Sequence, residues 1–100
     1  MSQQINLAIQ VLPLGISKEK AYSIIDEAIL QIQHSGLRYE VCPFETVIEG
    51  EYEAVMSLVD EIQNACNKAG AEEVLINMKL HRNFTKDMNI SDKTGKYKTS

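Results

Sequence analysis

Residues 36–51 have the sequence GLRYEVCPFETVIEGE, with two short strand-like runs on either side of Pro43. Apolar and polar side chains alternate in residues 37–44, and residues 46–49 form the second run, so the stretch predicts a pair of strands with a tight connection. The second run is apolar until Glu49, which places a carboxylate inside it. Because a carboxylate rarely stands there without a partner group, the sequence predicts that some group meets Glu49.

Two more strands and two helices are predicted around this pair. Residues 5–12 and residues 74–81 alternate in the same way and predict the first and fourth strands. Ser17 fits the N-cap of a first helix that ends at Gly36, and Gly70 ends a second helix that follows the strand pair. The apolar stripes of these helices are Ala21, Ile24, Ile25, Ala28 and Ile32 in the first, and Val55, Leu58, Val59, Ile62 and Cys66 in the second.

The order β-α-β-β-α-β predicts an α+β domain of the ferredoxin-like type, with a four-stranded antiparallel sheet and two helices on one face. Right-handed crossovers then place the third strand between the first and the second, and the fourth strand on the other side of the first. The uncovered sheet face mixes apolar and polar side chains, and its predicted members are Ala8, Gln10, Leu12, Cys42, Leu75, Asn77 and Lys79, with Arg38 and Glu40 nearby.

A partly apolar, uncovered sheet face usually meets another subunit. We therefore expect a homodimer or homotetramer that assembles through this face. The alternative is a sheet face that is simply solvated.

Length and composition are those of one globular domain of 100 residues, with 44% hydrophobic and 24% charged residues. The ferredoxin-like, ligand-binding domain is expected in residues 1–83, and residues 84–100 read as a polar, Lys-rich tail that is flexible or loosely docked. The net charge of -4 argues against a nucleic-acid partner, because no basic face could neutralise phosphates. No apolar run approaches the roughly 20 residues that span a bilayer, so we expect no membrane partner and a cytoplasmic protein.

Motifs that would indicate catalysis, a metal or a nucleotide cofactor are missing from the sequence. Cys42 and Cys66 have no CxxC spacing, and His34 and His81 stand far apart. No Gly-rich phosphate-binding loop is present. The expectation is a protein without a metal, a cofactor or catalytic residues, and so not an enzyme.

Glu49 allows three interpretations. Its carboxylate could bind a cationic or amidine-like ligand through charge-assisted hydrogen bonds. It could instead help to begin the helix after Gly50. It could also form an ion pair with Lys79 or Arg38.

Three neighbours of Glu49 are similarly open to two readings. Thr46 could hydrogen-bond a ligand or could be present as a good strand former. Tyr39 and Phe44 could stack on a flat heterocycle or could pack in the core.

The chain resembles the small thiamine-binding proteins over about residues 5–82. The resemblance lies in the segments VLPLG, GLRYEV-P, T-IEGE and V-INMKL, and its most specific part is G-L-x-Y-E followed by T-x-I-E-G-E. It implies a ferredoxin-like fold that assembles through its sheets into dimers and commonly tetramers. It also implies binding of thiamine or its hydroxymethylpyrimidine part, for thiamine salvage or transport, without enzyme activity.

Carried over position by position, the resemblance implies that ligand contacts come first from Thr46 and Glu49, then from Tyr39 or Phe44, with Gln10 and Asn77 held more loosely. Many members have Gly or Met near the position of Phe44 or Glu45, whereas this chain has an aromatic and a charged residue there.

The chemistry of thiamine suits an acidic, mildly aromatic cleft. Its thiazolium carries a fixed positive charge, and its aminopyrimidine offers a donor and ring-nitrogen acceptors. The resemblance thus predicts thiamine binding in the micromolar range or tighter, weakened by Glu49→Gln. The competing interpretations are a regulatory or structural sheet-pairing module without a small-molecule ligand, and a small enzyme of the dimeric ferredoxin-like barrel type.

Overall fold

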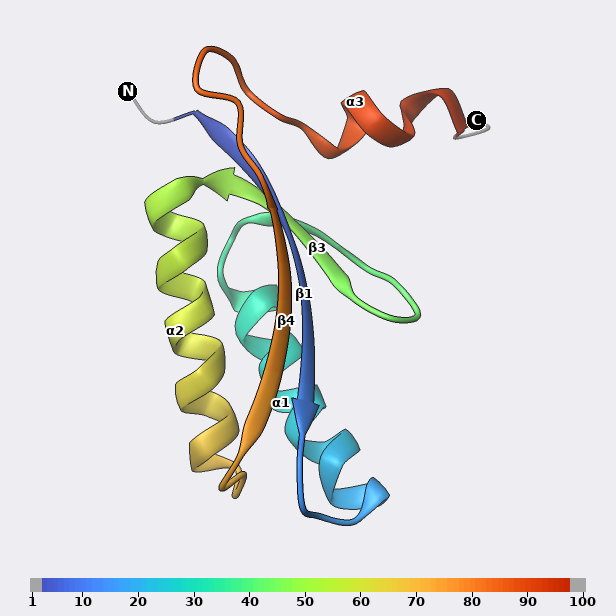
Figure 1. Ribbon diagram of the computed structural model, residues 1–100, viewed down its shortest axis with the longest axis vertical. Coiled ribbons are helices and arrows are strands. Elements are labelled where there is room, and N and C mark those ends of the chain that lie inside the picture. Colours follow the sequence, from blue (N-terminus) through green and yellow to red (C-terminus); the bar gives the residue numbers. More distant parts are fainter. Residues whose placement is uncertain (1–2, 98–100) are drawn as a thin grey trace.

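A computed structural model describes residues 3–97 of the chain (Figure 1). Its elements are β1 (Gln4–Pro13), α1 (Lys18–His34), β2 (Arg38–Val41), β3 (Thr46–Glu51), α2 (Tyr52–Lys68), β4 (Val74–His81) and α3 (Ile90–Thr94), followed by a 3₁₀ turn at Gly95–Tyr97. The sheet is antiparallel throughout, and its order is β2-β3-β1-β4. This is the ferredoxin-like fold and the strand order that the sequence predicts.

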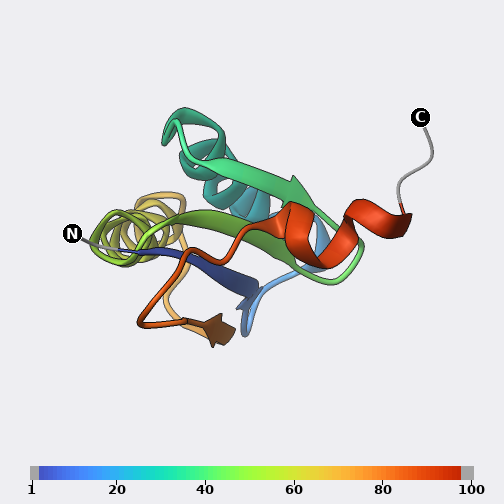
Figure 2. The ribbon, with the colours of Figure 1, turned by 90° about the horizontal axis from the view of Figure 1, so that it is seen from above.

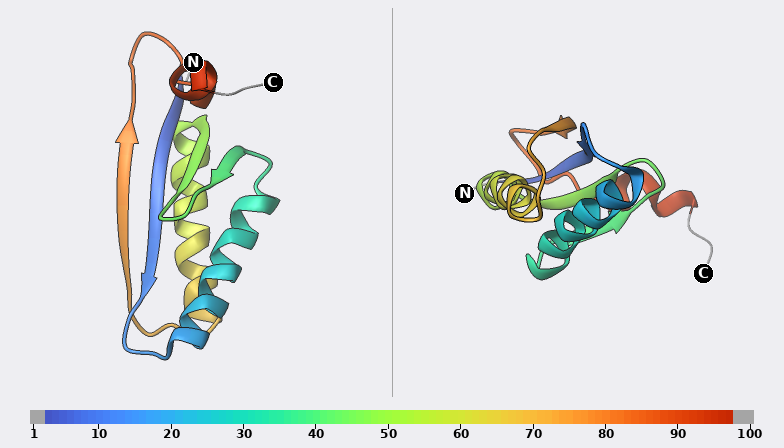
Figure 3. Two further views of the ribbon diagram at one scale, coloured as in Figure 1. Left: turned by 90° about the vertical axis from the view of Figure 1, so that its right-hand side faces the viewer. Right: turned by 90° about the horizontal axis from the view of Figure 1, so that it is seen from below.

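The two long helices cover one face of the sheet, and the core lies between these layers (Figure 3). From β1 the alternating residues Ile5, Leu7 and Ile9 enter this core, and Ile48 enters it from β3. All five residues of the stripe predicted for α2 are buried, as are Ile24, Ala28 and Ile32 of α1. Each buried Val, Leu or Ile side chain among them contributes roughly 1.5–3 kcal/mol through burial.

Element ends follow the local sequence signals. The Ser17 side chain accepts a hydrogen bond from the Lys20 amide at 3.2 Å, as expected of an N-cap. Gly36 has φ of 80°, a conformation that a side chain disfavours, so the predicted left-handed helix end is confirmed. The second predicted strand is shorter than residues 37–44, because the Cys42 amide donates to the Glu45 carbonyl at 2.9 Å and closes the β2–β3 hairpin there.

The sheet face away from α1 and α2, here called the outer face, contains the predicted residues. Across β1 and β4 the register pairs Ala8 with Lys79, and Leu12 with Leu75. Leu75 is 50% exposed there. Among residues 3–97 no helix is long and apolar enough to span a membrane.

The segment after β4, which the sequence predicts to be a flexible or loosely docked tail, contains a short helix and contacts the sheet. Residues 84–97, here called the C-terminal segment, return to the start of β1, and α3 projects from the sheet on the side opposite α2 (Figures 1 and 2). The Met88 amide donates to the Gln4 carbonyl, and the Gln4 amide donates to the Asp87 carboxylate, both at 2.8 Å. Ile90 is 3% exposed.

The sequence could not reveal this docking, because one buried Ile and a few backbone bonds give no periodic pattern. Residues 98–100 of the expected tail lie outside the described residues. The domain boundary at residue 83 stays a prediction.

Candidate functional site

Thr46 and Glu49, the two first-choice ligand residues, lie on opposite faces of β3. Thr46, Ile48 and Gly50 are buried on the helix side, whereas Val47 and Glu49 alternate with them and are half-buried on the outer side. A small molecule on one face of the sheet therefore cannot contact both side chains. The structure has a hollow on each face, and the two are described in turn.

The first hollow, here called the helix-side groove, lies between α1 and the sheet beneath the tip of the β2–β3 hairpin. It has a volume of about 290 Å³. Ile25 and Ile29 of α1 line one side, and the hairpin residues Phe44 and Thr46 line the other. Phe44 and Thr46 are both among the predicted site residues, so the fold brings these two together.

Thr46 is a polar residue of this groove that is buried as a whole and makes no side-chain hydrogen bond. The residue as a whole is 7% exposed, and within residues 3–97 its hydroxyl makes no hydrogen bond and is not fully buried. Two aromatic rings stand at the rim, since Phe44 is 82% exposed and Tyr22 is 57% exposed. An apolar slot with exposed rings and one hydroxyl that makes no hydrogen bond can hold a flat heterocycle and fix its orientation.

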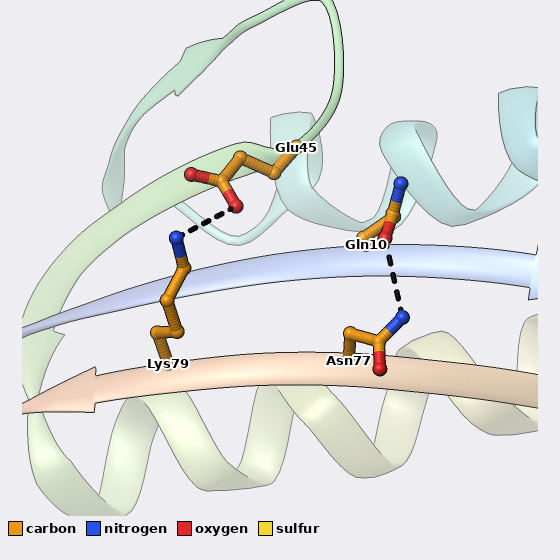
Figure 4. Close-up of polar contacts among 4 residues, drawn as sticks. All are labelled: Gln10, Glu45, Asn77 and Lys79. Carbon is orange, nitrogen blue, oxygen red and sulfur yellow. Dashed lines mark hydrogen bonds and ion pairs between the residues drawn. The ribbon is translucent and has the colours of Figure 1, made fainter.

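Tyr39, Asn77 and Gln10, which were also predicted as ligand residues, have other contacts in the structure. Tyr39 packs half-buried against the core and lines neither hollow. The Asn77 side-chain amide donates to Gln10 Oε1 at 3.2 Å across β1 and β4 (Figure 4). Gln10 also borders the helix-side groove, but its amide oxygen is occupied by this bond on the outer face.

The group that meets Glu49 comes from the C-terminal segment. The Glu49 carboxylate accepts a hydrogen bond from the Ile90 amide. Glu49 does not cap α2, whose N-cap is Glu51, and Lys79 pairs with Glu45 instead, at 3.6 Å (Figure 4). The sequence thus correctly predicted that Glu49 has a partner. None of the three interpretations of Glu49, however, named the Ile90 amide.

The second hollow, here called the outer-face cavity, lies on the outer face between α3 and the β2–β3 hairpin and has a volume of about 410 Å³. Ala8 and Val47 are paired across β1 and β3 and line its floor. Ile90 borders it from α3. Its charged lining residues are Glu40, Glu45, Lys79 and Lys93, and His81 lies beside them.

Asn6 lines the outer-face cavity and was missed by the sequence reasoning. It is 4% exposed, and its Nδ2 donates to the Met88 carbonyl at 2.9 Å. Its Oδ1 is buried without a hydrogen-bond partner among the described residues. An unpaired buried acceptor costs about 1–3 kcal/mol, so it marks a place where a donor would be favoured. A lone Asn in an alternating strand gives no sequence signal of this.

Among residues 3–97 neither hollow contains a cluster of metal ligands, although the Cys42 thiol lines both hollows. In residues 3–97 no three His, Cys, Asp or Glu residues are grouped so as to hold a metal ion. Burial raises the pKa of the Cys66 thiol, which disfavours the reactive thiolate. Cys42 is exposed at the hairpin.

Comparison with known proteins finds a family match and a relative that both cover most of the chain. The family described as "Thiamine-binding protein" matches residues 7–98. A UPF0045 protein of Clostridium perfringens is 30% identical over 94 residues, which cover 93% of this chain and 96% of the relative.

Two solved structures resemble the chain over nearly its whole length. A domain of unknown function from Bacillus cereus has a TM-score of 0.91 and 41% identity, covering 98% of this chain and 93% of that one. A Thermotoga maritima protein, whose name proposes a part in thiamine biosynthesis or salvage, has a TM-score of 0.87 and 27% identity, covering 95% and 99%. With the family match over most of its length, this chain belongs to the thiamine-binding protein family.

Proposed function

We propose that the protein binds thiamine or its hydroxymethylpyrimidine part in the helix-side groove, and that it serves thiamine salvage or transport without catalysing a reaction. The observation that carries this proposal is Thr46, a residue only 7% exposed, whose hydroxyl makes no hydrogen bond within residues 3–97 and which lines an apolar groove with aromatic residues at its rim. Membership of a family described as thiamine-binding and the name of the Thermotoga relative support the choice of ligand.

The groove matches the two halves of thiamine. Ile25 and Ile29 offer apolar contact to the pyrimidine ring, and Phe44 and Tyr22 offer faces for stacking. The Thr46 hydroxyl can donate to a ring nitrogen or accept from the amino group. Glu45 also borders the groove, but its carboxylate is paired with Lys79 at 3.6 Å, so this ion pair has to open before the carboxylate can reach the cationic thiazolium.

Isothermal titration calorimetry with thiamine tests the proposal. We expect a dissociation constant in the micromolar range or tighter, and Thr46→Val should weaken binding by about 3- to 10-fold, because one hydrogen bond is worth about 0.5–1.5 kcal/mol. Valine keeps the shape and the strand preference of threonine. Thr85→Val is the matched control, since Thr85 is exposed in the C-terminal segment and bonds to Asn83.

The proposal is wrong if neither thiamine nor the pyrimidine alcohol produces heat or a thermal shift. Equal affinities of the Thr46→Val variant and the unaltered protein would place the ligand elsewhere. In the first case the sheet-pairing module without a ligand becomes the better interpretation, and exposed apolar residues on β4 favour that alternative.

A second part of the proposal is self-assembly through the sheet into a homodimer or homotetramer. β4 is an edge strand, and its residues Leu75, Met78 and Leu80 are 50%, 45% and 46% exposed. An apolar edge with unpaired backbone groups favours pairing with an identical strand about a two-fold axis. The cytoplasmic location expected from the sequence remains a prediction.

A further inference from the structure

Glu45 is a charged residue of the β2–β3 hairpin that borders both hollows. Among the described residues that line the helix-side groove, no other has a charged side chain. The backbone of Glu45 is fixed, because its carbonyl accepts the Cys42 amide at 2.9 Å. Its side chain keeps rotatable bonds with several staggered positions, so the carboxylate is the part of this residue that can move.

Lys79 holds the Glu45 carboxylate away from the groove. Lys79 stands opposite Ala8 in the register of β1 and β4, and its Nζ lies 3.6 Å from Glu45 Oε1 (Figure 4). The Lys79 side chain is 79% exposed and that of Glu45 33% exposed. An ion pair of this length and exposure is weak and screened by salt, so a competing cation can open it.

The two candidate ligands place different demands on this ion pair. Thiamine has a thiazolium with a fixed positive charge, and this charge is stabilised by a carboxylate beside it. The pyrimidine alcohol lacks the thiazolium and gains nothing from the carboxylate as an ion. Lys79 therefore competes with thiamine for one carboxylate, but it does not compete with the pyrimidine alcohol.

We infer that the Lys79–Glu45 ion pair sets the preference of the helix-side groove between a cationic and a neutral heterocycle. The inference rests on the proposed function, because it concerns the same groove. Closed, the pair favours a neutral aminopyrimidine; open, it admits a heterocycle with a fixed positive charge. Glu45 contacts the cation, and Lys79 is a positioning residue that acts through Glu45.

Calorimetric titrations of both ligands into four proteins test this inference. The proteins are the unaltered chain, Lys79→Met, Glu45→Gln and the double variant. We expect Lys79→Met to raise thiamine affinity about 2- to 5-fold and Glu45→Gln to lower it by a similar factor, because an exposed ion pair has this strength. The affinity for the pyrimidine alcohol should stay the same in all four.

The double variant shows whether Lys79 acts through Glu45. Without the Glu45 carboxylate there is nothing to compete for, so Lys79→Met should have no further effect in the Glu45→Gln background. Lys93→Met is the matched control, because Lys93 is exposed and lines the outer-face cavity with Lys79 but is not paired with Glu45. It removes the same charge and should leave the ratio of the two affinities unchanged.

The ratio of the two affinities is the decisive readout, since a change in fold or assembly would alter both affinities together. The inference is overturned if Lys79→Met leaves this ratio unchanged or lowers the thiamine affinity. It is also overturned if Lys93→Met has the same effect, or if Lys79→Met acts fully without the Glu45 carboxylate.

These outcomes leave the proposed function intact as long as the unaltered protein binds either ligand. If it binds the pyrimidine alcohol alone, Lys79→Met must make thiamine binding measurable, or the inference fails. Absence of binding for both ligands overturns the proposed function and this inference with it.

Discussion

Glu49 shows how far the sequence determines the role of a single residue. A carboxylate inside an apolar strand predicted a partner, and that partner exists in the Ile90 amide. Its identity was beyond sequence reasoning, since the two residues are 41 positions apart and Ile90 belongs to a segment without periodic pattern. Thr46 could be named in advance, and its place on the opposite face from Glu49 already follows from the alternation of side chains along the predicted strand, because the two residues are three positions apart.

Substitution of Glu49 distinguishes a ligand contact from a tie to the C-terminal segment. Glu49→Ala removes the acceptor for the Ile90 amide, so hydrogen exchange of residues 88–94 should rise clearly, whereas Glu49→Gln keeps an acceptor oxygen and should raise it little. Exchange measured by mass spectrometry provides the readout. Thiamine affinity should change little in either variant if the helix-side groove is the binding site.

A marked loss of thiamine affinity in Glu49→Gln, with unchanged hydrogen exchange in residues 88–94, would contradict the prediction that Glu49 holds the C-terminal segment and does not contact thiamine. It would restore Glu49 as a direct ligand residue, as the family resemblance implied.

At the scale of elements, the long helices and strands could be predicted because each has a repeated pattern and a distinct end. α2 buries the whole predicted stripe, and Gly36 has the predicted left-handed conformation. The errors fall where a pattern is short. β2 ends at Val41 because the hairpin closes with a backbone bond, and α3 has only Ile90 as a buried residue.

The N-cap of α1 offers a test at this scale. Ser17→Ala removes the acceptor for the Lys20 amide and should lower the free energy of unfolding by about 1 kcal/mol. Ser23→Ala is the control, because Ser23 is exposed inside the same helix, where alanine is the better helix former. Urea unfolding of both variants gives the comparison. A loss of equal size at both positions would show that the Ser17 side chain does not act as a cap.

At the scale of the whole molecule, the outer face and the β4 edge are the surfaces through which copies of the chain are proposed to associate. The sequence predicted which residues lie on the outer face, and the register of β1 and β4 confirms Ala8, Leu12 and Leu75. It could not predict that the C-terminal segment covers the end of this face near Asn6. The area open to a partner is thus smaller than the alternating pattern alone implies.

Leu75→Lys tests the proposed assembly. A charged side chain on the outer face should shift the protein toward monomer in native mass spectrometry and in light scattering, because the desolvation of lysine opposes association. Leu30→Lys is the matched control, as Leu30 is 37% exposed on α1 and lies away from β4. Retention of the same subunit number in both variants would exclude Leu75 from the interface.

The position of β1 has a consequence for the order in which the chain can fold during synthesis. β1 is the first strand to be made, yet its two neighbours, β3 and β4, are made later, and Gln4 also binds residues 87 and 88. On a ribosome, the strand at the centre of the sheet therefore waits for almost every other element to emerge. Until then its apolar residues Ile5, Leu7 and Ile9 lack their final surroundings, and only α1, β3 and α2, as each is made, can shield them.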